Sequence, residues 1–220
     1  MSKLVSNLQQ IKDSLPQHVT LVAVSKTKPA SDIKEGYEAG HRDFGENKIQ
    51  EMTAKWEELP KDIKWHMIGH VQTNKVKYMA PYVHLIHAVD KMKLLKEVNK
   101  QAKKNDRVID CLIQVKIAQE DSKFGLSPED AEKLILNPEL AKYPNVRIKG
   151  LMGMATFTDN EEQLQKEFNT IEKLFKKLQE EVSGFDTLSI GMSGDYKIAM
   201  KHGSTMVRIG SSIFGERDYH

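Results

Sequence analysis

Apolar residues along this chain gather into short runs that recur at regular intervals. Runs of this length, rich in Val, Ile and Leu and bounded by turn residues, are typical of buried parallel strands. The predicted strands are Thr20–Ser25, Arg42–Gly45, Ile63–Ile68, Val83–Val89, Val108–Val115, Val146–Met152, Thr187–Ile190 and Thr205–Ile209.

Segments with helical periodicity lie between these runs, and many of them begin or end at Pro, Gly or a capping residue. Asp90 is expected to cap one helix, and Thr158 with Glu161 forms a capping-box pattern at the start of a longer one. The predicted helices are Leu4–Ser14, Ala30–Ala39, Asn47–Leu59, Thr73–Ala80, Asp90–Lys103, one entered at Ser127–Asp130, Thr158–Gly184 and Asp195–His202.

Eight strands alternating with helices predict a (β/α)8 TIM barrel formed by residues 1–220 as a single domain, with an extra N-terminal helix. An open doubly wound sheet shows the same alternation and is the main alternative, but the count of eight favours the barrel. In a barrel, functional side chains lie at the carboxyl ends of the strands.

Composition is that of a soluble domain with a sizeable core, with 39% hydrophobic and 29% charged residues. The net charge of +2 gives no reason to expect nucleic acid or an anionic membrane as a partner. The start at Met1 lacks a signal-peptide apolar region, and no apolar stretch is long enough to span a bilayer, so we expect a cytoplasmic protein. The one cysteine, Cys111, lies in an apolar run and is expected in the core.

Lys26 follows the first predicted strand directly, at the end of the barrel where functional groups are expected. The pKa of lysine falls readily on burial, and the neutral amine attacks aldehydes, so Lys26 is a candidate for a Schiff base with a carbonyl ligand. The alternative is a strand-end lysine whose ammonium group reaches water.

The segments after the seventh and eighth predicted strands are rich in Gly and Ser, with Ser193 and Gly194 in one and Gly210 and Ser211 in the other. Barrels commonly bind phosphate at these two loops, although many ordinary turns have a similar composition. Arg208 lies within the eighth strand, where a buried guanidinium needs acceptors. Arg208 is expected either to contact a ligand or to form a structural ion pair with a barrel carboxylate.

Asn47 and His66 lie near the ends of the second and third predicted strands and are candidates for the same site. The alternatives are a helix cap for Asn47 and a packed core histidine for His66. No metal site is expected: His66 and His70 lack the Glu of a helical zinc motif. His84 and His87 would point to opposite faces of a strand.

A lysine for an aldehyde, a cradle for a phosphate and an arginine inside the barrel together fit one ligand, pyridoxal 5′-phosphate. Because an arginine only donates hydrogen bonds, Arg208 facing the pyridine nitrogen would keep that nitrogen unprotonated. This arrangement weakens the electron-sink behaviour on which most pyridoxal enzymes rely.

Several motifs in order along essentially the whole chain resemble the pyridoxal phosphate homeostasis protein family. They are Ala23–Lys28, Phe44–Asn47, Trp65–Gly69, Gly150–Met152, Gly191–Ser193 and Gly203–Gly210. The resemblance implies a fold-type III barrel like the N-terminal domain of alanine racemase, with pyridoxal phosphate as cofactor.

By the same resemblance, Lys26 carries the Schiff base, Asn47 lies beside the cofactor, and Arg208 faces the pyridine nitrogen. The residues implied to hold the phosphate are Ser193, Gly210 and Ser211, with backbone help from Gly194. Many relatives have an acidic or other residue at the position of Gly194 and Thr at the position of Ser211. A proline common in relatives is replaced by His70, which receives no role.

The family is implicated in keeping intracellular pyridoxal phosphate in balance and has no firm catalytic activity, so the expectation is a binding protein rather than an enzyme. Alanine racemase needs a second domain that supplies a tyrosine base, and this sequence ends at His220, soon after the last predicted strand. Weak racemase activity with Lys26 as the one base remains the alternative.

A monomer is expected. A third possibility is an interaction surface on the charged segment Glu161–Glu181, for which a solvated helix face is the simpler explanation.

Overall fold

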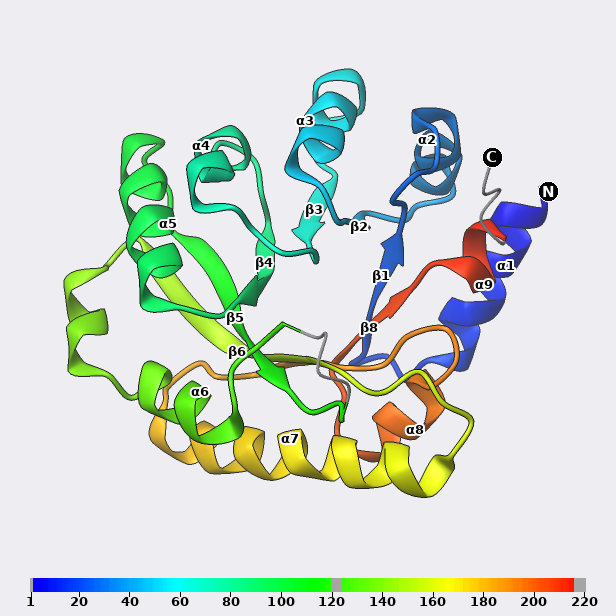
Figure 1. Ribbon diagram of the computed structural model, residues 1–220. Coiled ribbons are helices and arrows are strands. Elements are labelled where there is room, and N and C mark those ends of the chain that lie inside the picture. The colour runs from blue at the N-terminus through cyan, green and yellow to red at the C-terminus, as the bar shows by residue number, and fades with distance from the viewer. Residues whose placement is uncertain (1, 120–123, 216–220) are drawn as a thin grey trace.

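The eight predicted strands form a closed parallel barrel in which each strand pairs with its neighbours in the chain and β8 pairs with β1 (Figure 1). The structure, a computed structural model, describes residues 2–119 and 124–215; Tyr219 and His220 lie outside the described residues. Closure confirms the TIM barrel and excludes the open sheet. The strands are β1 (Thr20–Val24), β2 (Asp43–Glu46), β3 (Lys64–Met67), β4 (Leu85–Val89), β5 (Ile109–Lys116), β6 (Val146–Met154), β7 (Thr187–Ser189) and β8 (Met206–Ile209).

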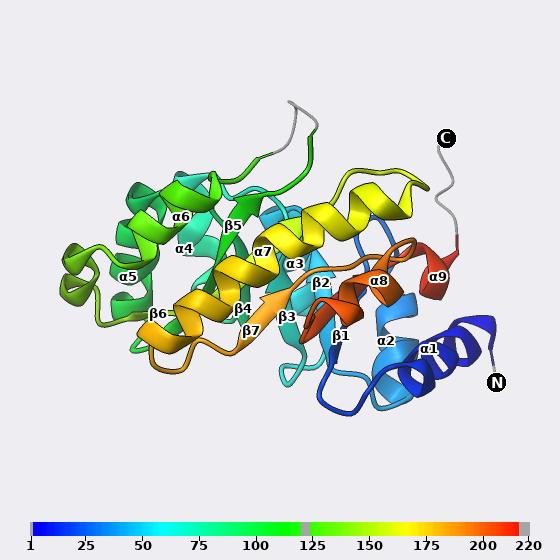
Figure 2. The ribbon, with the colours of Figure 1, turned by 90° about the horizontal axis from the view of Figure 1, so that it is seen from below.

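Helices surround the barrel, and the longest, α7, packs along its outside against β6 (Figure 2). The predicted N-terminal helix is confirmed as α1, which lies beside α9, and Asn7 Nδ2 donates a 3.1 Å hydrogen bond to Ile213 O. The helices are α1 (Lys3–Ser14), α2 (Ala30–Glu38), α3 (Ile49–Glu58), α4 (Val76–Met79), α5 (Met92–Lys104), α6 (Pro128–Ile135), α7 (Glu161–Glu181), α8 (Tyr196–Lys201) and α9 (Ser211–Phe214), with 3-10 turns η1 (Thr73–Lys75) and η2 (Pro138–Lys142).

Two predicted helix caps are wrong. Asp90 does not cap α5, which begins at Met92 with Lys91 in the capping position. The capping residue of α7 is Asn160, whose side chain accepts a 3.1 Å hydrogen bond from Gln163 N, while the hydroxyl of Thr158 accepts from Asn160 N. A second cap-forming residue, two positions nearer the helix, therefore caps α7 in place of Thr158.

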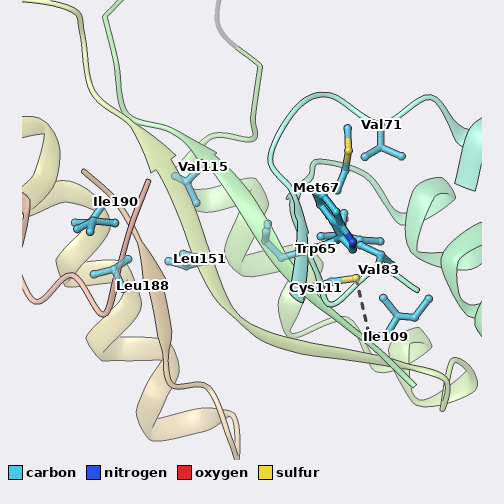
Figure 3. Packing of buried hydrophobic residues seen from close by; sticks show 14 of the residues in the cluster. Trp65, Met67, Val71, Val83, Ile109, Cys111, Val115, Leu151, Leu188 and Ile190 are labelled. Atoms are coloured by element: carbon cyan, nitrogen blue, oxygen red, sulfur yellow. Dashed lines mark hydrogen bonds between the residues drawn. The ribbon is translucent and has the colours of Figure 1, made fainter. Parts of the chain in front are cut away.

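The main core lies between the outer face of the barrel and the helices. Trp65 and Met67 of β3 are fully buried there, beside Val83 and Cys111 (Figure 3). Each such fully buried apolar side chain contributes roughly 1.5–3 kcal/mol through removal from water. The predicted core position of Cys111 is confirmed, and burial raises the pKa of its thiol.

A smaller apolar cluster fills the inside of the barrel. Its members are Val22, Leu85, Ala88, Leu112, Met152 and Met206. Because these side chains fill the interior, a ligand site is expected at the ends of the strands. Among the helices of the described residues, none combines the length and the apolar character that a membrane crossing requires.

Candidate functional site

A cavity of about 630 Å³ opens at the carboxyl ends of the strands. Seven of the eight residues predicted for the site line it together, and they follow or end β1, β2, β7 and β8. These seven are Lys26, Asn47, Ser193, Gly194, Arg208, Gly210 and Ser211. Residues separated by more than 180 positions in the sequence therefore face one space, as the barrel topology requires.

The turn that carries Lys26 is held by a buried ion pair beneath it. Lys55 Nζ lies 2.7 Å from Glu46 Oε1, with side chains 9% and 0% exposed. Lys55 also donates a 2.9 Å hydrogen bond to the backbone carbonyl of Ser25, whose hydroxyl donates a 2.6 Å bond to Glu46. Burial raises the pKa of Glu46 to about 7, against the opposing effects of Lys55 and Ser25. The residue directly before Lys26 is thus fixed by groups from β2 and α3.

The residue directly after Lys26 is held by the same helix. Thr27 adopts a positive φ of 65°, a conformation that non-glycine residues rarely take. Its backbone N–H donates a 2.6 Å hydrogen bond to Glu51 Oε1, and Glu51 in turn pairs with Lys55 at 2.8 Å. Contacts on both sides therefore define where the chain turns and where the side chain of Lys26 begins.

Asn47 lines the cavity and does not cap a helix, since α3 begins after Lys48. Its position depends on close packing against Gly69, the residue that follows Ile68 after β3. A Cβ atom at Gly69 would lie 2.2 Å from the backbone oxygen of Asn47, so only glycine fits. This contact explains the glycine in the motif Trp65–Gly69.

Arg208 is 4% exposed and its guanidinium is held inside the barrel. One terminal nitrogen donates to Ser189 O at 2.7 Å and to Ser189 Oγ at 2.6 Å, and the other donates to Gly153 O at 2.9 Å. Burial lowers the pKa of Arg208 to about 10, opposed by the charge of Asp195, so the group stays cationic at neutral pH. The oxygens that accept from the guanidinium are therefore neutral backbone and hydroxyl groups of Ser189 and Gly153.

The loop between β7 and α8 is tied to its surroundings at several points. Asp195 Oδ1 accepts a 2.6 Å hydrogen bond from Met192 N, and Gly191 O accepts a 2.9 Å bond from Arg208 N. Gly191 has a φ of 97°, and a Cβ atom there would lie 2.8 Å from the Cβ of Ala199. The loop therefore presents Ser193 to the cavity from a constrained backbone.

His66, the eighth predicted residue, does not line the cavity. It is fully buried within β3, with Nε2 3.0 Å from Asp43 Oδ1 and Nδ1 2.9 Å from His87 Nε2. His66 is therefore a packed core histidine, which was the alternative to a place in the site. The strand ends at Met67, and the cavity begins only at Ile68.

These histidines belong to a hydrogen-bonded row that crosses the barrel from Arg208 to Asp43. His87 Nδ1 lies 3.0 Å from the Ser189 hydroxyl that accepts from Arg208. Burial lowers the pKa of His87 well below its usual range, so this ring is neutral. Because a carboxylate only accepts, His66 donates to Asp43 through Nε2, and the other ring nitrogens of His66 and His87 each have a partner within 3.0 Å. Every polar group in the row then has a partner.

His84 and His87 do not point away from each other as expected. The ring of His84 lies 5.3 Å from that of His66, and the ring of His87 lies 5.2 Å from it. His84 precedes β4 rather than belonging to it, and the pairing of β4 with β5 is irregular between Ile86 and Val89. The alternation rule of an ideal strand therefore does not apply to this pair.

Sequence reasoning missed several residues that line the cavity, chiefly Gln114 of β5 and His70 after β3. Gln114 is 3% exposed and donates a 3.2 Å hydrogen bond to Phe124 O. The ring of His70 stacks on that of Phe124, with centroids 4.6 Å apart. A buried amide within the apolar run Val108–Val115 was a signal that could have identified Gln114.

A single barrel with a lysine after β1 and serine-rich loops after β7 and β8 on one cavity defines the class of the alanine racemase N-terminal domain. The family model of that description, "Alanine racemase, N-terminal domain", matches residues 1–218. Within this class, the chain belongs to the pyridoxal phosphate homeostasis protein family. It is 41% identical to the pyridoxal phosphate homeostasis protein of Aquifex aeolicus, covering 90% of this chain and 87% of that protein. The Vibrio alginolyticus protein of the same name is 38% identical, with 100% of each chain covered.

Solved structures agree with this assignment. PipY of Synechococcus elongatus with pyridoxal phosphate bound superposes with a TM-score of 0.86 at 33% identity, covering 96% of this chain and 100% of PipY. Alanine racemase of Clostridium difficile superposes with a TM-score of 0.81 at 18% identity and shares the fold. The superposition covers 98% of this chain and 57% of the racemase chain.

Proposed function

We propose that this protein binds pyridoxal 5′-phosphate in the cavity at the carboxyl ends of the strands, covalently through Lys26, and serves in pyridoxal phosphate homeostasis. The observation that carries the proposal is the convergence of Lys26, Arg208 and the Ser/Gly loops on one cavity. The names of the relatives and the cofactor-bound PipY structure support the same cofactor.

The donor set of the cavity fits this cofactor group by group. A primary amine at Lys26 suits an aldehyde, and the amine needs the fixed position that the Lys55–Glu46 pair provides. The hydroxyls of Ser193 and Ser211 and the backbone at Gly194 and Gly210 suit a phosphate. When bound, pyridoxal phosphate supplies an aldehyde for covalent attachment and a ring that accepts electrons.

The remaining two residues act on the ring. Arg208 would donate a hydrogen bond to the pyridine nitrogen and, since a guanidinium cannot accept one from a protonated ring, would keep that nitrogen unprotonated. Its bonds to Ser189 and Gly153 hold the guanidinium in place before any ligand arrives. Asn47 would lie beside the ring. These roles favour retention of the cofactor over strong electron withdrawal from a substrate.

A cofactor titration followed by visible absorbance tests the proposal. Purified protein mixed with pyridoxal phosphate is expected to develop an absorbance band distinct from that of the free cofactor, and Lys26→Ala is expected to lack it. Lys48→Ala, which removes a nearby exposed lysine outside the cavity, is the control and should keep the band. An unchanged band in Lys26→Ala, or no band in the natural protein, contradicts the proposal.

Amino-acid racemase activity is the second candidate, because Lys26 could abstract one proton. The lining of the cavity, taken over the described residues, contains no tyrosine that could serve as a second base. We therefore propose a binding role without firm catalytic activity. Exchange of the Cα hydrogen of alanine for deuterium, followed by NMR, distinguishes the two: exchange no faster than with free cofactor supports the binding role, and enzyme-like exchange contradicts it.

Two further expectations accompany this role: a location in the cytoplasm and a monomeric state. Multi-angle light scattering behind size-exclusion chromatography measures the second directly. A mass near 25.1 kDa supports the monomer, and twice that mass contradicts it.

A further inference from the structure

Three polar side chains that do not line the cavity lie close to one another in the barrel. Asp43 is the first residue of β2, His66 lies in the neighbouring strand β3, and His84 directly precedes β4. One ligand atom from each, a carboxylate oxygen and two imidazole nitrogens, lies within 4.8 Å of the other two. Cofactor binding at Lys26 uses none of these groups.

We propose that Asp43, His66 and His84 form a binding site for a divalent transition-metal ion of the Zn²⁺ type. Two imidazoles and one carboxylate are the ligand set of many three-residue zinc sites, in which water takes the fourth position. Imidazole nitrogens also favour Zn²⁺, Co²⁺ or Ni²⁺ over Mg²⁺ and Ca²⁺, which prefer an all-oxygen set.

The distances are compatible with this ion. Metal–ligand bonds of about 2.0–2.2 Å place the ligand atoms of a tetrahedral site roughly 3.3–3.6 Å apart. His66 Nε2 and Asp43 Oδ1 are already 3.0 Å apart. His84 is exposed, so rotation of its side chain can close the remaining distance while His66 stays fixed in the barrel. Its exposure also provides the path by which an ion enters.

The hydrogen bond between His66 and His87 supports a metal site at His66. A histidine that binds metal through one nitrogen normally donates the other N–H to a fixed acceptor, which sets the orientation of the ring. His66 Nδ1 lies 2.9 Å from His87 Nε2, and His87 is itself held by Ser189 at 3.0 Å. With an ion on Nε2, His66 carries its proton on Nδ1 and donates it to His87 Nε2, and His87 then carries its own proton on Nδ1 and donates it to the Ser189 hydroxyl.

The charge balance at the site is moderate. Asp43 supplies one negative charge, and the ammonium of Lys64 acts on both Asp43 and His84 and opposes a cation. Asp110 acts on His84 in the opposite sense. We therefore expect one ion per chain at this site, with an affinity that depends on all three ligands together.

Titration of the full-length protein with Co²⁺, followed by visible spectroscopy and calorimetry, tests the site. One Co²⁺ per chain with a four-coordinate spectrum is expected. His84→Asn is expected to weaken Co²⁺ binding at least about 10-fold. Removal of a residue that only hydrogen-bonds to a metal ligand already costs about 10-fold in affinity, and loss of a ligand itself should cost no less. His18→Asn, an exposed histidine before β1, is the control and should bind as the natural protein does.

Asp43→Asn serves as a second variant, and circular dichroism checks that each variant is folded. Failure of the natural protein to bind Co²⁺ or Zn²⁺ overturns the proposal. So does binding that is unchanged in folded His84→Asn and Asp43→Asn, because the ion would then lie elsewhere, for example at His70 in the cavity. Cofactor absorbance at Lys26 is recorded in parallel, so that a failure here is not confused with loss of the proposed function.

Discussion

Replacing Lys55 by Met removes one partner of the buried ion pair under the Lys26 turn. Glu46 is fully buried and would lose the cation beside it, while the carbonyl of Ser25 would lose a 2.9 Å hydrogen bond. Removal of one partner of a buried ion pair typically costs about 3–5 kcal/mol of unfolding free energy. For a domain of this size, that loss corresponds to a fall in Tm on the order of 10 °C.

The pH dependence of this variant tests the cause. The pKa of Glu46 in the folded protein, about 7, lies above the ordinary value of 4.5. The folded state therefore binds more protons than the unfolded state between these values, and the contribution of Glu46 to stability falls as pH rises through this window. Without Lys55 the folded pKa rises further, so the deficit of Lys55→Met should grow from about pH 5 to about pH 8.

Urea unfolding followed by far-UV circular dichroism at the two pH values measures these changes. The double variant Glu46→Gln with Lys55→Met should recover part of the loss, because no buried charge remains. Lys166→Met breaks an i,i+4 pair with Glu162 on the surface of α7 and is the control, expected to change little. A loss below about 1 kcal/mol in Lys55→Met, or a deficit that shrinks as pH rises, would refute the reasoning.

Two other substitutions test neighbouring parts of the account. Gly69→Ala should destabilise the protein by at least about 2 kcal/mol in urea unfolding, since its Cβ would lie 2.2 Å from Asn47 O. Gly194→Ala, with nothing within 4 Å of the new Cβ, is its control, and equal losses in both variants would contradict the packing argument. Ser189→Ala should lower stability by about 1–3 kcal/mol because His87 loses its buried partner; no measurable loss would show that the row from Arg208 to Asp43 does not need this hydroxyl.

Strand positions were predictable because each run of apolar residues is buried on the helix side, and the closed barrel follows from their number. The residues after β1, β2, β7 and β8 were placed on one cavity for the same reason: parallel strands in a barrel end at the same rim. Glycine and serine in the last two loops added chemistry to those positions. These strand and loop positions can be predicted without knowing how neighbouring strands are staggered.

Other features depend on stagger and on long-range contacts that a sequence pattern does not contain. His66 lies one residue before the end of β3, and the register of β3 with its neighbours turns it into the barrel, away from the rim. The Lys55–Glu46 pair joins a helix to a strand beneath Ser25, and nothing in the periodicity of α3 marks Lys55 as buried. His84 and Asp43 come together only because β2, β3 and β4 are adjacent.

Borohydride reduction of the cofactor-loaded protein, followed by peptide mass spectrometry, tests whether Lys26 holds the cofactor. Reduction makes a lysine–cofactor link permanent, so the modified peptide identifies the residue that holds the cofactor. We expect a single pyridoxyl group on Lys26, with none on Lys28 in the same cavity. Modification of Lys28 or of surface lysines in place of Lys26, or no modification at all, would contradict it.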